Sequence, residues 1–382
     1  MPPSNGLSRS LCAALLPCLL VACGESSGEG TGGSTTTSTT TSEPTTTTDT
    51  TTSTVDPDAP WSFATAAVDG LPPVWGAAVA QASPEVAYLV GGVKGTSGPV
   101  AAAAYKIEQG SSGVTVTTVS EAVTARFCGC AMVDEKRGEL ITLGGRGKDF
   151  TETPTAEIIA LATGEVTPLD AGEAAAHPVG CHAVFLPDRD EGYVFGGAAQ
   201  ADGFDGRTWR YSPSDRSLTL LDGAGPPARY DGVMRYPVAG GSVWLVAGMG
   251  ISAGKAKFYS DVWRLDPAAG TWTEAPANGD APKGRRIPWV AFTADAGTLV
   301  MGMGSDSAQG QTMVDDLWRF DTSTGVWTTI EKTGDLIPPA RGFAPWLPGP
   351  EGSAGMMSGG LQDLGAAKDV LIFQPPVPGS FR

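Results

Sequence analysis

The sequence predicts an all-β protein, a six-bladed β-propeller closed by an N-terminal strand in the last blade. Six apolar runs that each end in Gly recur along residues 61–382, and their end points are 53, 52, 51, 54 and 58 residues apart. Trp263 and Trp318 are 55 residues apart, and so are Trp272 and Trp327. Repetition at one period of this length is typical of radial or stacked repeat folds. The 52 Gly and 30 Pro residues suit many short strands joined by turns.

Each repeat contains four predicted strands, of which the second is the apolar run that ends in Gly. The six runs are Ala87–Gly92, Glu139–Gly145, Gly192–Gly197, Trp244–Gly248, Leu299–Gly302 and Ala354–Gly360. A polar loop follows, then a third strand with an aromatic residue, a tight turn and a fourth strand. A four-stranded blade has two apolar faces that only neighbouring blades can cover, so the blades must surround a common axis. We expect the aromatic residues of the third and fourth strands to pack between blades.

The last repeat has only three predicted strands. The folded part begins with Trp61–Thr65, followed by a loop into Leu71, and this order matches the fourth strand of the fourth repeat and its loop. We therefore expect the first strand to complete the last blade. Pairing the first segment with the last removes the exposed sheet edges and closes the ring.

The order of hydrophobic residues, a Gly pair, a spaced Tyr or Trp and a further Trp resembles the kelch repeat. The resemblance covers nearly all of residues 61–382 and is strongest in the third, fourth and fifth copies. The second copy has Ile158-Ile159 and Val166 in place of both aromatics. The fourth and fifth copies have Ala247-Gly248 and Met301-Gly302 in place of the Gly pair.

Residues 1–22 are predicted to be a lipoprotein signal peptide. Arg9 precedes the apolar run Leu11–Val21, which is too short to span a bilayer stably. The ending Leu20-Val21-Ala22-Cys23 resembles the bacterial lipobox, which implies a lipidated Cys23 and stable anchoring to the envelope by several acyl chains. Gly24 after the cysteine favours the outer membrane or cell surface, by resemblance to Gram-negative sorting. A soluble secretory signal is the alternative.

Residues 23–60 are predicted to be a disordered tether. Of the 24 residues from Thr31 to Thr54, 15 are Thr, and no large apolar side chain occurs from Gly24 to Thr54. Such a segment cannot bury enough surface to offset the entropy of ordering. A flexible coil of this length separates its ends by roughly 30–37 Å on average. The tether would hold the propeller away from the membrane, and its Thr-rich composition also suits an O-glycosylated stalk.

The formal charge of −16 limits the kinds of partner. A nucleic-acid partner would require a basic surface, and so would electrostatic attachment to anionic lipid. Solubility is the simplest role for the acidic excess. We therefore expect no nucleic-acid partner and a monomeric propeller head whose only contact with the membrane is the lipid anchor.

Strand order places the loops between strands 2 and 3 (2–3 loops) on the same face as the connections between blades (4–1 connections). The 2–3 loops, such as Met249–Ser260, are long and polar, and such loops on a rigid scaffold are common binding sites. The 4–1 connections carry a recurring basic residue at Arg126, His177, Arg229, Arg286 and Arg341. This repetition predicts a basic ring at the channel mouth that would favour an anionic or carboxylate-rich ligand. The alternative is that each Arg pairs with a neighbouring acid as part of the repeat.

Three cysteines lie in the predicted propeller: Cys128, Cys130 and Cys181. Cys128 and Cys130 are two residues apart and are expected on one face of a strand. Cys130 and Cys181 occupy matching positions in the first strands of adjacent repeats. Since an exported protein meets an oxidising compartment, we predict a disulfide from Cys181 to Cys128 or Cys130. A metal site that includes His182, or plain buried thiols, are the alternatives.

No catalytic residue, metal site or cofactor is predicted. The sequence lacks a Ser/His/Asp arrangement, a phosphate-binding Gly loop and a metal-ligand motif. The copper galactose oxidases are kelch propellers with two Tyr and two His ligands, but this chain has only two His residues, close together. Five loop acids could bind calcium, although solvated acids are the commoner explanation: Asp202, Asp205, Asp306, Asp315 and Asp316.

The predicted function is non-catalytic binding of a protein or glycan through the face that carries the 2–3 loops and 4–1 connections. The alternative is a carbohydrate-active enzyme such as a sugar mutarotase or epimerase. It follows from the resemblance, because periplasmic sialate mutarotases are also six-bladed kelch proteins.

Overall fold

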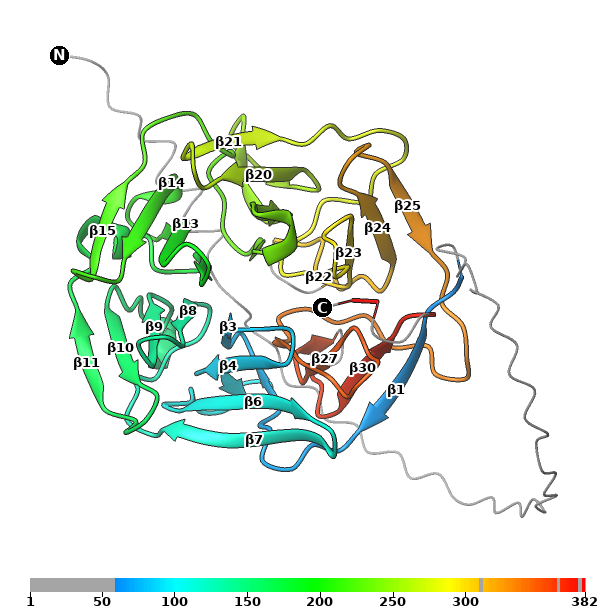
Figure 1. Ribbon diagram of the computed structural model, residues 1–382, viewed down its shortest axis with the longest axis horizontal. Helices are drawn as coiled ribbons and strands as arrows, with labels where there is room; N and C mark the ends of the chain where they lie inside the picture. Colours follow the sequence, from blue (N-terminus) through cyan, green and yellow to red (C-terminus); the bar gives the residue numbers. More distant parts are fainter. Residues whose placement is uncertain (1–58, 309–311, 363–364, 377–379, 382) are drawn as a thin grey trace.

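The computed structural model describes residues 59–308, 312–362, 365–376 and 380–381. The predicted signal peptide, Cys23 and nearly all of the predicted tether lie outside the described residues. Six four-stranded antiparallel sheets surround a central axis (Figure 1). This arrangement confirms the predicted all-β, six-bladed propeller.

The strands of each blade follow one another from the centre outwards. Blade 1 consists of β3 (Ala78–Gln81), β4 (Val86–Val90), β6 (Ala104–Gly110) and β7 (Gly113–Ser120). Blade 2 consists of β8 (Cys130–Asp134), β9 (Glu139–Leu143), β10 (Ala156–Ala160) and β11 (Val166–Leu169). Blade 3 consists of β12 (His182–Leu186), β13 (Glu191–Ala199), β14 (Gly203–Ser212) and β15 (Ser217–Leu220). Blade 4 consists of β16 (Val233–Arg235), β17 (Val243–Val246), β20 (Val262–Asp266) and β21 (Thr271–Glu274). Blade 5 consists of β22 (Trp289–Phe292), β23 (Thr298–Gly302), β24 (Leu317–Asp321) and β25 (Trp327–Ile330). Blade 6 is β26 (Trp346–Leu347), β27 (Gly355–Ser358), β30 (Val370–Gln374) and β1 (Ser62–Ala66).

Three short two-stranded sheets supplement the blades. They pair β2 (Val74–Trp75) with β5 (Val93–Lys94), β18 (Met249–Ser252) with β19 (Lys255–Phe258), and β28 (Leu361–Gln362) with β29 (Gly365–Ala366). The helical elements of the described chain are three 3₁₀ turns: η1 (Lys148–Phe150), η2 (Gly172–Ala175) and η3 (Val238–Gly240). Within the described residues, no helix combines the length and hydropathy needed to cross a membrane.

The ring closes through β1, as the sequence predicts. β1 pairs antiparallel with β30, from Ser62 opposite Gln374 to Ala66 opposite Val370. Just before β1, the Trp61 N–H donates to the Glu331 carbonyl at 2.8 Å and thereby fastens the start of the propeller to the end of blade 5. The first and last segments therefore form one continuous sheet with no free outer edge on β30.

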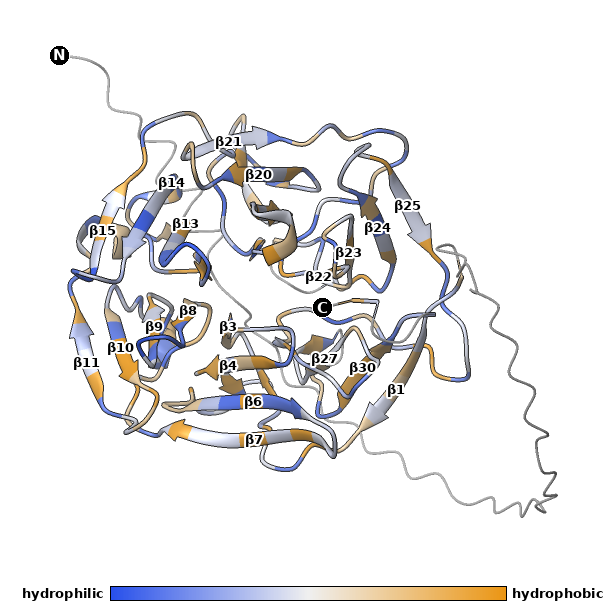
Figure 2. Ribbon diagram, in the orientation of Figure 1, coloured by the Kyte–Doolittle hydropathy of each residue, from blue (hydrophilic) through white to orange (hydrophobic). Residues whose placement is uncertain are grey.

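The core lies between neighbouring blades. Burial is complete on β22 and β27 but sparse on the outer β21, and Figure 2 shows the same contrast in hydropathy between β27 and β21. Trp263 and Trp272 pack against the buried cluster shared by blades 3 and 4. The aromatic residues of the outer strands thus fill space between blades, which is the role expected from the repeat.

A backbone hydrogen bond joins each blade to the next. In every repeat, the second residue of the Gly pair donates its N–H to a carbonyl in the following 4–1 connection. The bonds run Gly92 to Arg126, Gly145 to Pro178, Gly197 to Arg229, Gly248 to Arg285, Gly304 to Arg341 and Gly360 to Val74, at 2.6–3.0 Å. All six donors have positive φ, between 90° and 111°, which glycine adopts at little cost.

This register corrects the fifth copy of the repeat. The pair equivalent to Gly-Gly is Met303-Gly304, because Met301 and Gly302 lie inside β23, opposite Trp318 and Leu317. Met303 has the left-handed φ of 57° that glycine has in most other copies, and so does Ala247 in the fourth copy, at 63°. Non-glycine residues therefore occupy a conformation that the sequence pattern assigns to glycine.

We predict that Gly197→Ala destabilises the propeller by about 3 kcal/mol or more. Gly197 has a φ of 111°, and an added Cβ would lie 2.3 Å from the His177 carbonyl oxygen. Gly254→Ala is the matched control, because Gly254 has a φ of 74° and an added Cβ there meets nothing within 4 Å. Urea unfolding should show a loss of only about 1–2 kcal/mol for the control. Equal losses for both variants would mean that the close packing between blades contributes little.

Candidate functional site

The central channel is filled at the end that carries the 2–3 loops and 4–1 connections. Trp75, Phe127, Tyr230 and Phe343 are buried there, each just before the first strand of its blade. Trp75 makes edge-to-face contacts with Phe127 and Phe343, at ring-centroid distances of 5.2 and 6.1 Å. We name these four residues the aromatic plug. It occupies the face on which the sequence predicts ligand binding.

The opposite end of the channel opens into a cavity of about 820 Å³, which we name the channel cavity. The inner strands line it, together with connections at the outer end of those strands, including Ser83–Glu85, Pro187, Val238 and Gly349. A narrower space of about 140 Å³ is lined by several of the same residues and extends toward the plug. The hollow side of this propeller is therefore the face of the 1–2 and 3–4 turns.

Six residues with left-handed backbone line the narrow space at its end next to the aromatic plug, and one of them, Phe343, also belongs to the plug. They are Gly76, Cys128, Gly180, Asp231, Ile287 and Phe343, one from each blade, with φ between 50° and 66°. Five of them donate an N–H to the matching carbonyl of the preceding blade, as in Cys128 to Gly76 at 2.6 Å and Asp231 to Gly180 at 2.9 Å. These bonds draw the blades together around the axis and narrow the channel.

Three of the basic residues predicted at the channel mouth are fully buried and paired with an acid of the same blade. Arg126 meets Glu157 at 2.8 Å, Arg229 meets Asp261 at 2.8 Å and Arg341 meets Asp369 at 3.0 Å. The equivalent residue of blade 5 is Arg285, which pairs with Asp316 at 2.9 Å. These contacts correspond to the alternative that the sequence left open. A role for these residues in ligand binding stays a prediction.

The four paired arginines share one geometry, which we name the arginine clamp. Nη1 donates to the carbonyl of the first residue of the Gly pair, at 2.9 Å for Gly144 and 3.1 Å for both Ala247 and Met303. Gly359 accepts the same bond in blade 6, at 3.4 Å. The clamp therefore ties each 4–1 connection to the end of the second strand and the start of the third.

Arg286 and His177 lie one position away from the clamp. Arg286 is buried in the plug end, where it pairs with Asp231 and its guanidinium stacks on Tyr230 and Phe343 at 4.8 and 5.0 Å. Burial raises the pKa of Asp231, while Arg286 acts in the opposite direction. In blade 3 the clamp position is Pro178, and the neighbouring His177 lies 3.3 Å from the Asp205 carboxylate.

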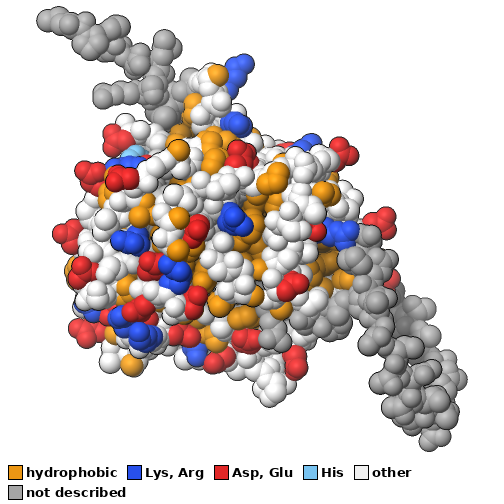
Figure 3. Space-filling view, turned by 45° about the horizontal axis from the view of Figure 1, so that its top comes forward, with side chains coloured by type: hydrophobic (Ala, Val, Ile, Leu, Met, Phe, Trp, Pro, Cys, Tyr) orange, Lys and Arg blue, Asp and Glu red, His pale blue; other side chains and the backbone are white. Residues whose placement is uncertain are grey.

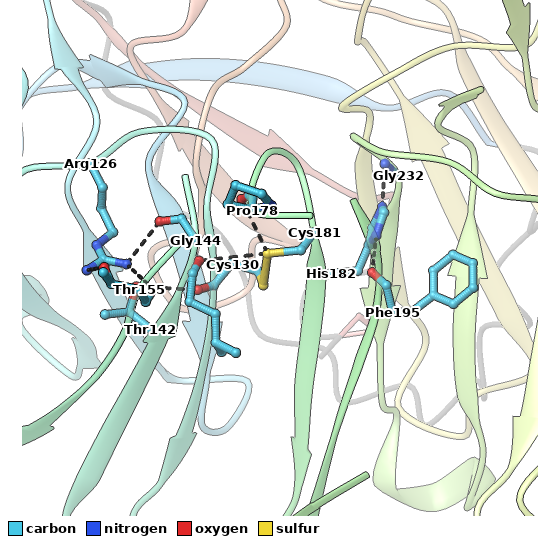
Figure 4. The surroundings of a disulfide bond; sticks show 11 residues. Arg126, Cys130, Thr142, Gly144, Thr155, Pro178, Cys181, His182, Phe195 and Gly232 are labelled. Carbon is cyan, nitrogen blue, oxygen red and sulfur yellow. Dashed lines mark hydrogen bonds between the residues drawn. A yellow bond between two sulfur atoms is a disulfide. The ribbon is translucent and has the colours of Figure 1, made fainter. Parts of the chain in front are cut away.

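A disulfide joins the inner parts of blades 2 and 3 (Figure 4). It links Cys130 and Cys181, whose Cα atoms are 5.4 Å apart, and this is one of the two pairings that the sequence left open. Cys128 does not share a strand face with Cys130. It lies before β8, at one of the six left-handed positions, with φ of 53°. The two-residue spacing was therefore a misleading guide to strand geometry.

His182 is held by backbone groups on both sides of its ring (Figure 4). Nε2 accepts the Gly232 N–H at 2.6 Å, and Nδ1 donates to the Phe195 carbonyl at 2.9 Å. The neutral ring is thus fully engaged and has no lone pair left for a metal. In the part of the chain that the structure describes, no three His, Cys, Asp or Glu side chains gather into a possible metal site.

Sequence reasoning missed the channel cavity and its one basic lining residue, Arg235, at the end of β16. A signal was present in the repeat. The structurally equivalent positions in the other five blades are Ala80, Met132, Val184, Ala291 and Leu347. A single charged residue at an otherwise apolar repeat position could have marked the site.

The outer surface carries no concentrated basic area in the view of Figure 3. Acidic and basic side chains are interspersed there, with hydrophobic side chains exposed between them.

The fold and the blind central channel define a β-propeller with a small internal cavity. The chain belongs to the kelch-repeat family, since the family model for the KLHDC2/KLHL20/DRC7 Kelch-repeats domain matches residues 76–287 and 162–349. The solved structure of YjhT is similar, with a TM-score of 0.59 and 16% sequence identity over 80% of this chain and 96% of that one. At this identity the similarity shows the fold alone. No curated protein matches the chain in sequence.

We predict that His182 makes stability depend on pH. Burial is the main cause that lowers its pKa from 6.5 to about 4. The unfolded chain then binds a proton that the folded one excludes, so stability is lost as pH falls from 6.5 toward 4, by about 3 kcal/mol in all. His182→Gln should be less stable than wild type at pH 7 but lose less stability between pH 7 and 4.5 in urea unfolding. An unchanged dependence in His182→Gln would contradict this assignment.

Proposed function

We propose that this kelch propeller is a membrane-anchored, surface-displayed binding module that recognises a protein or glycan through the face of the channel cavity. The observation that carries the proposal is the cavity itself, about 820 Å³ in volume and closed at its inner end. A blind cavity of this size can enclose a small ligand or the end of a chain. At the opposite mouth, the aromatic plug fills the channel among the residues that the structure describes.

The chemistry around the narrow space supports binding rather than catalysis. Asp231 is paired with Arg286, and both ring nitrogens of His182 are engaged by the backbone. A general acid or base needs a proton-transfer group within reach of the substrate, and these two groups are already committed to the fold.

The described chain begins on the cavity side of the propeller, which supports an anchor on that side. β1 begins at the end of blade 6 where β30 stops, because Ser62 pairs with Gln374. Just before β1, Trp61 contacts Phe381 edge-on at 4.9 Å, and Phe381 also lines the cavity. The 37 residues from Gly24 to Pro60, as a tether roughly 30–37 Å long on average, would leave room for a ligand between this face and the membrane.

For the anchor, we predict that Cys23→Ser releases the protein from the membrane fraction. The substitution removes the thiol that the lipobox-like sequence provides for acylation. Fractionation of cells that produce wild type and variant, followed by immunoblotting, measures the effect. Cys18→Ser, within the predicted signal peptide, is the control and should remain membrane-bound. Retention of Cys23→Ser in the membrane would contradict a lipid anchor at this residue.

For the binding face, we predict that Val238→Asp abolishes ligand capture and that Phe150→Asp preserves it. Both residues are exposed and apolar, at 57% and 44%, and both changes add one negative charge. Val238 lies at the cavity, whereas Phe150 lies in the 2–3 loop of blade 2. Glycan-array binding and affinity capture with each variant provide the measurement. The reverse pattern would place binding on the 2–3 loop face, and turnover of a bound sugar would contradict a non-catalytic role.

A further inference from the structure

Arg235 differs from every other arginine described above in having no acidic partner. Its Nη1 donates to the Met234 carbonyl at 3.0 Å, and Nε is buried without a hydrogen-bond partner among the described residues. Arg235 lines both the channel cavity and the narrow space, and among the described residues that line either it is the one Arg or Lys. An isolated positive charge therefore lies inside an acidic protein.

The repeat shows that the fold does not need a charge at this position. The other five blades place Ala, Met, Val, Ala or Leu at the equivalent point, and four of these residues are buried: Ala80, Met132, Ala291 and Leu347. An apolar side chain thus satisfies the same inner-strand environment. The clamp arginines, by contrast, recur from blade to blade with their acids. Arg235 is a feature of blade 4 and not of the kelch repeat.

The groups around the cavity leave the charge uncompensated. The acids that line the cavity are Glu85 and Glu351, both exposed, and Asp231 at the inner end is paired with Arg286. Burial is the cause that lowers the pKa of Arg235 to about 10, which leaves it protonated at neutral pH. Arg235 is half-buried and has no acidic partner among the described residues, so an anion that entered the cavity would compensate its charge.

We propose that Arg235 binds the carboxylate group of a ligand that enters the channel cavity. This inference deepens the proposed function and rests on it. The planar guanidinium matches a carboxylate in geometry. One positive charge also neutralises one negative charge, whereas a phosphate dianion would leave excess negative charge in a confined space of a protein with a net charge of −16. The cavity lining adds apolar surface from Phe185, Phe292 and Trp346, which suits a ligand with an apolar body.

Matched acid and neutral probes test the inference on the full-length chain. N-acetylphenylalanine and its amide represent a peptide C-terminus, glucuronate and glucose represent a sugar acid, and inorganic phosphate represents an adventitious anion. Isothermal titration calorimetry should show saturable binding of at least one carboxylate probe and at least tenfold weaker binding of its neutral counterpart and of phosphate. The pair that binds identifies the source of the carboxylate.

Variants of Arg235 separate a binding role from a structural one. Arg235→Met introduces the residue that blade 2 has at this position and should weaken carboxylate binding at least tenfold, with a melting temperature equal to or above that of wild type. Arg235→Lys keeps the charge without the planar fork and should bind with intermediate affinity. Arg264→Met is the control, since Arg264 is an exposed residue of β20 in the same blade. It should bind like wild type.

Two results would overturn the inference. In the first, the wild-type protein binds no acid probe more tightly than the matching neutral probe. In the second, Arg235→Met binds the acid probe with wild-type affinity. These results are distinct from failure of the proposed function. If a neutral probe or an array glycan binds and Val238→Asp abolishes that binding, the cavity face is a binding site without a carboxylate subsite. If Val238→Asp leaves all binding intact, the cavity face itself is wrong.

Discussion

The hydrogen bond from the second Gly of each pair to the next 4–1 connection sets the geometry of the whole ring. It requires a backbone with φ near 100°, and an added Cβ at Gly197 would strike the backbone of the neighbouring connection. In four blades an arginine clamp holds the carbonyl that accepts this bond, because the same residue supplies both the carbonyl and the buried guanidinium. A charged side chain can be fully buried at such a point because its acid and at least one backbone carbonyl replace the lost water. The repeated residues thus join neighbouring blades, and most of the polar residues of the repeat take part in these contacts.

The sequence predicted this architecture well because the joining device recurs. The period, the six blades and the closing strand all follow from residues that must repeat if each blade is to contact the next. The finer register was less accessible. Met303 adopts the left-handed conformation that glycine has in most other copies, so a Gly-based alignment selected Met301-Gly302 instead. The same shift assigned Arg286, rather than Arg285, to the recurring basic position. A sequence pattern identifies the residue that adopts a conformation with the least backbone strain, whereas tertiary contacts can hold a residue that is more strained in it.

The location of the open cavity could not be read from loop length. Long polar loops do lie on the 2–3 face, but the residues that fill the channel there stand immediately before the first strands, at Trp75, Phe127, Tyr230 and Phe343. Their side chains converge only when the blades are assembled around the axis. At the other end of the channel the inner strands line a space that stays open. Which end is filled is therefore a property of six separate strands together and not of any one repeat.

Ligand recognition in such a scaffold has to come from departures from the repeat, because the repeated residues already satisfy one another. The clamp arginines illustrate this, since each is paired with an acid and a backbone carbonyl of its own blade. Arg235 shows it from the other side. It occupies an apolar position of the repeat, has no acidic partner among the described residues, and lines the channel cavity on the side where β1 begins. A positive charge that the fold neither needs nor neutralises has its interaction energy still available for a ligand. The asymmetry of blade 4 is therefore a better guide to recognition than the sixfold pattern that surrounds it.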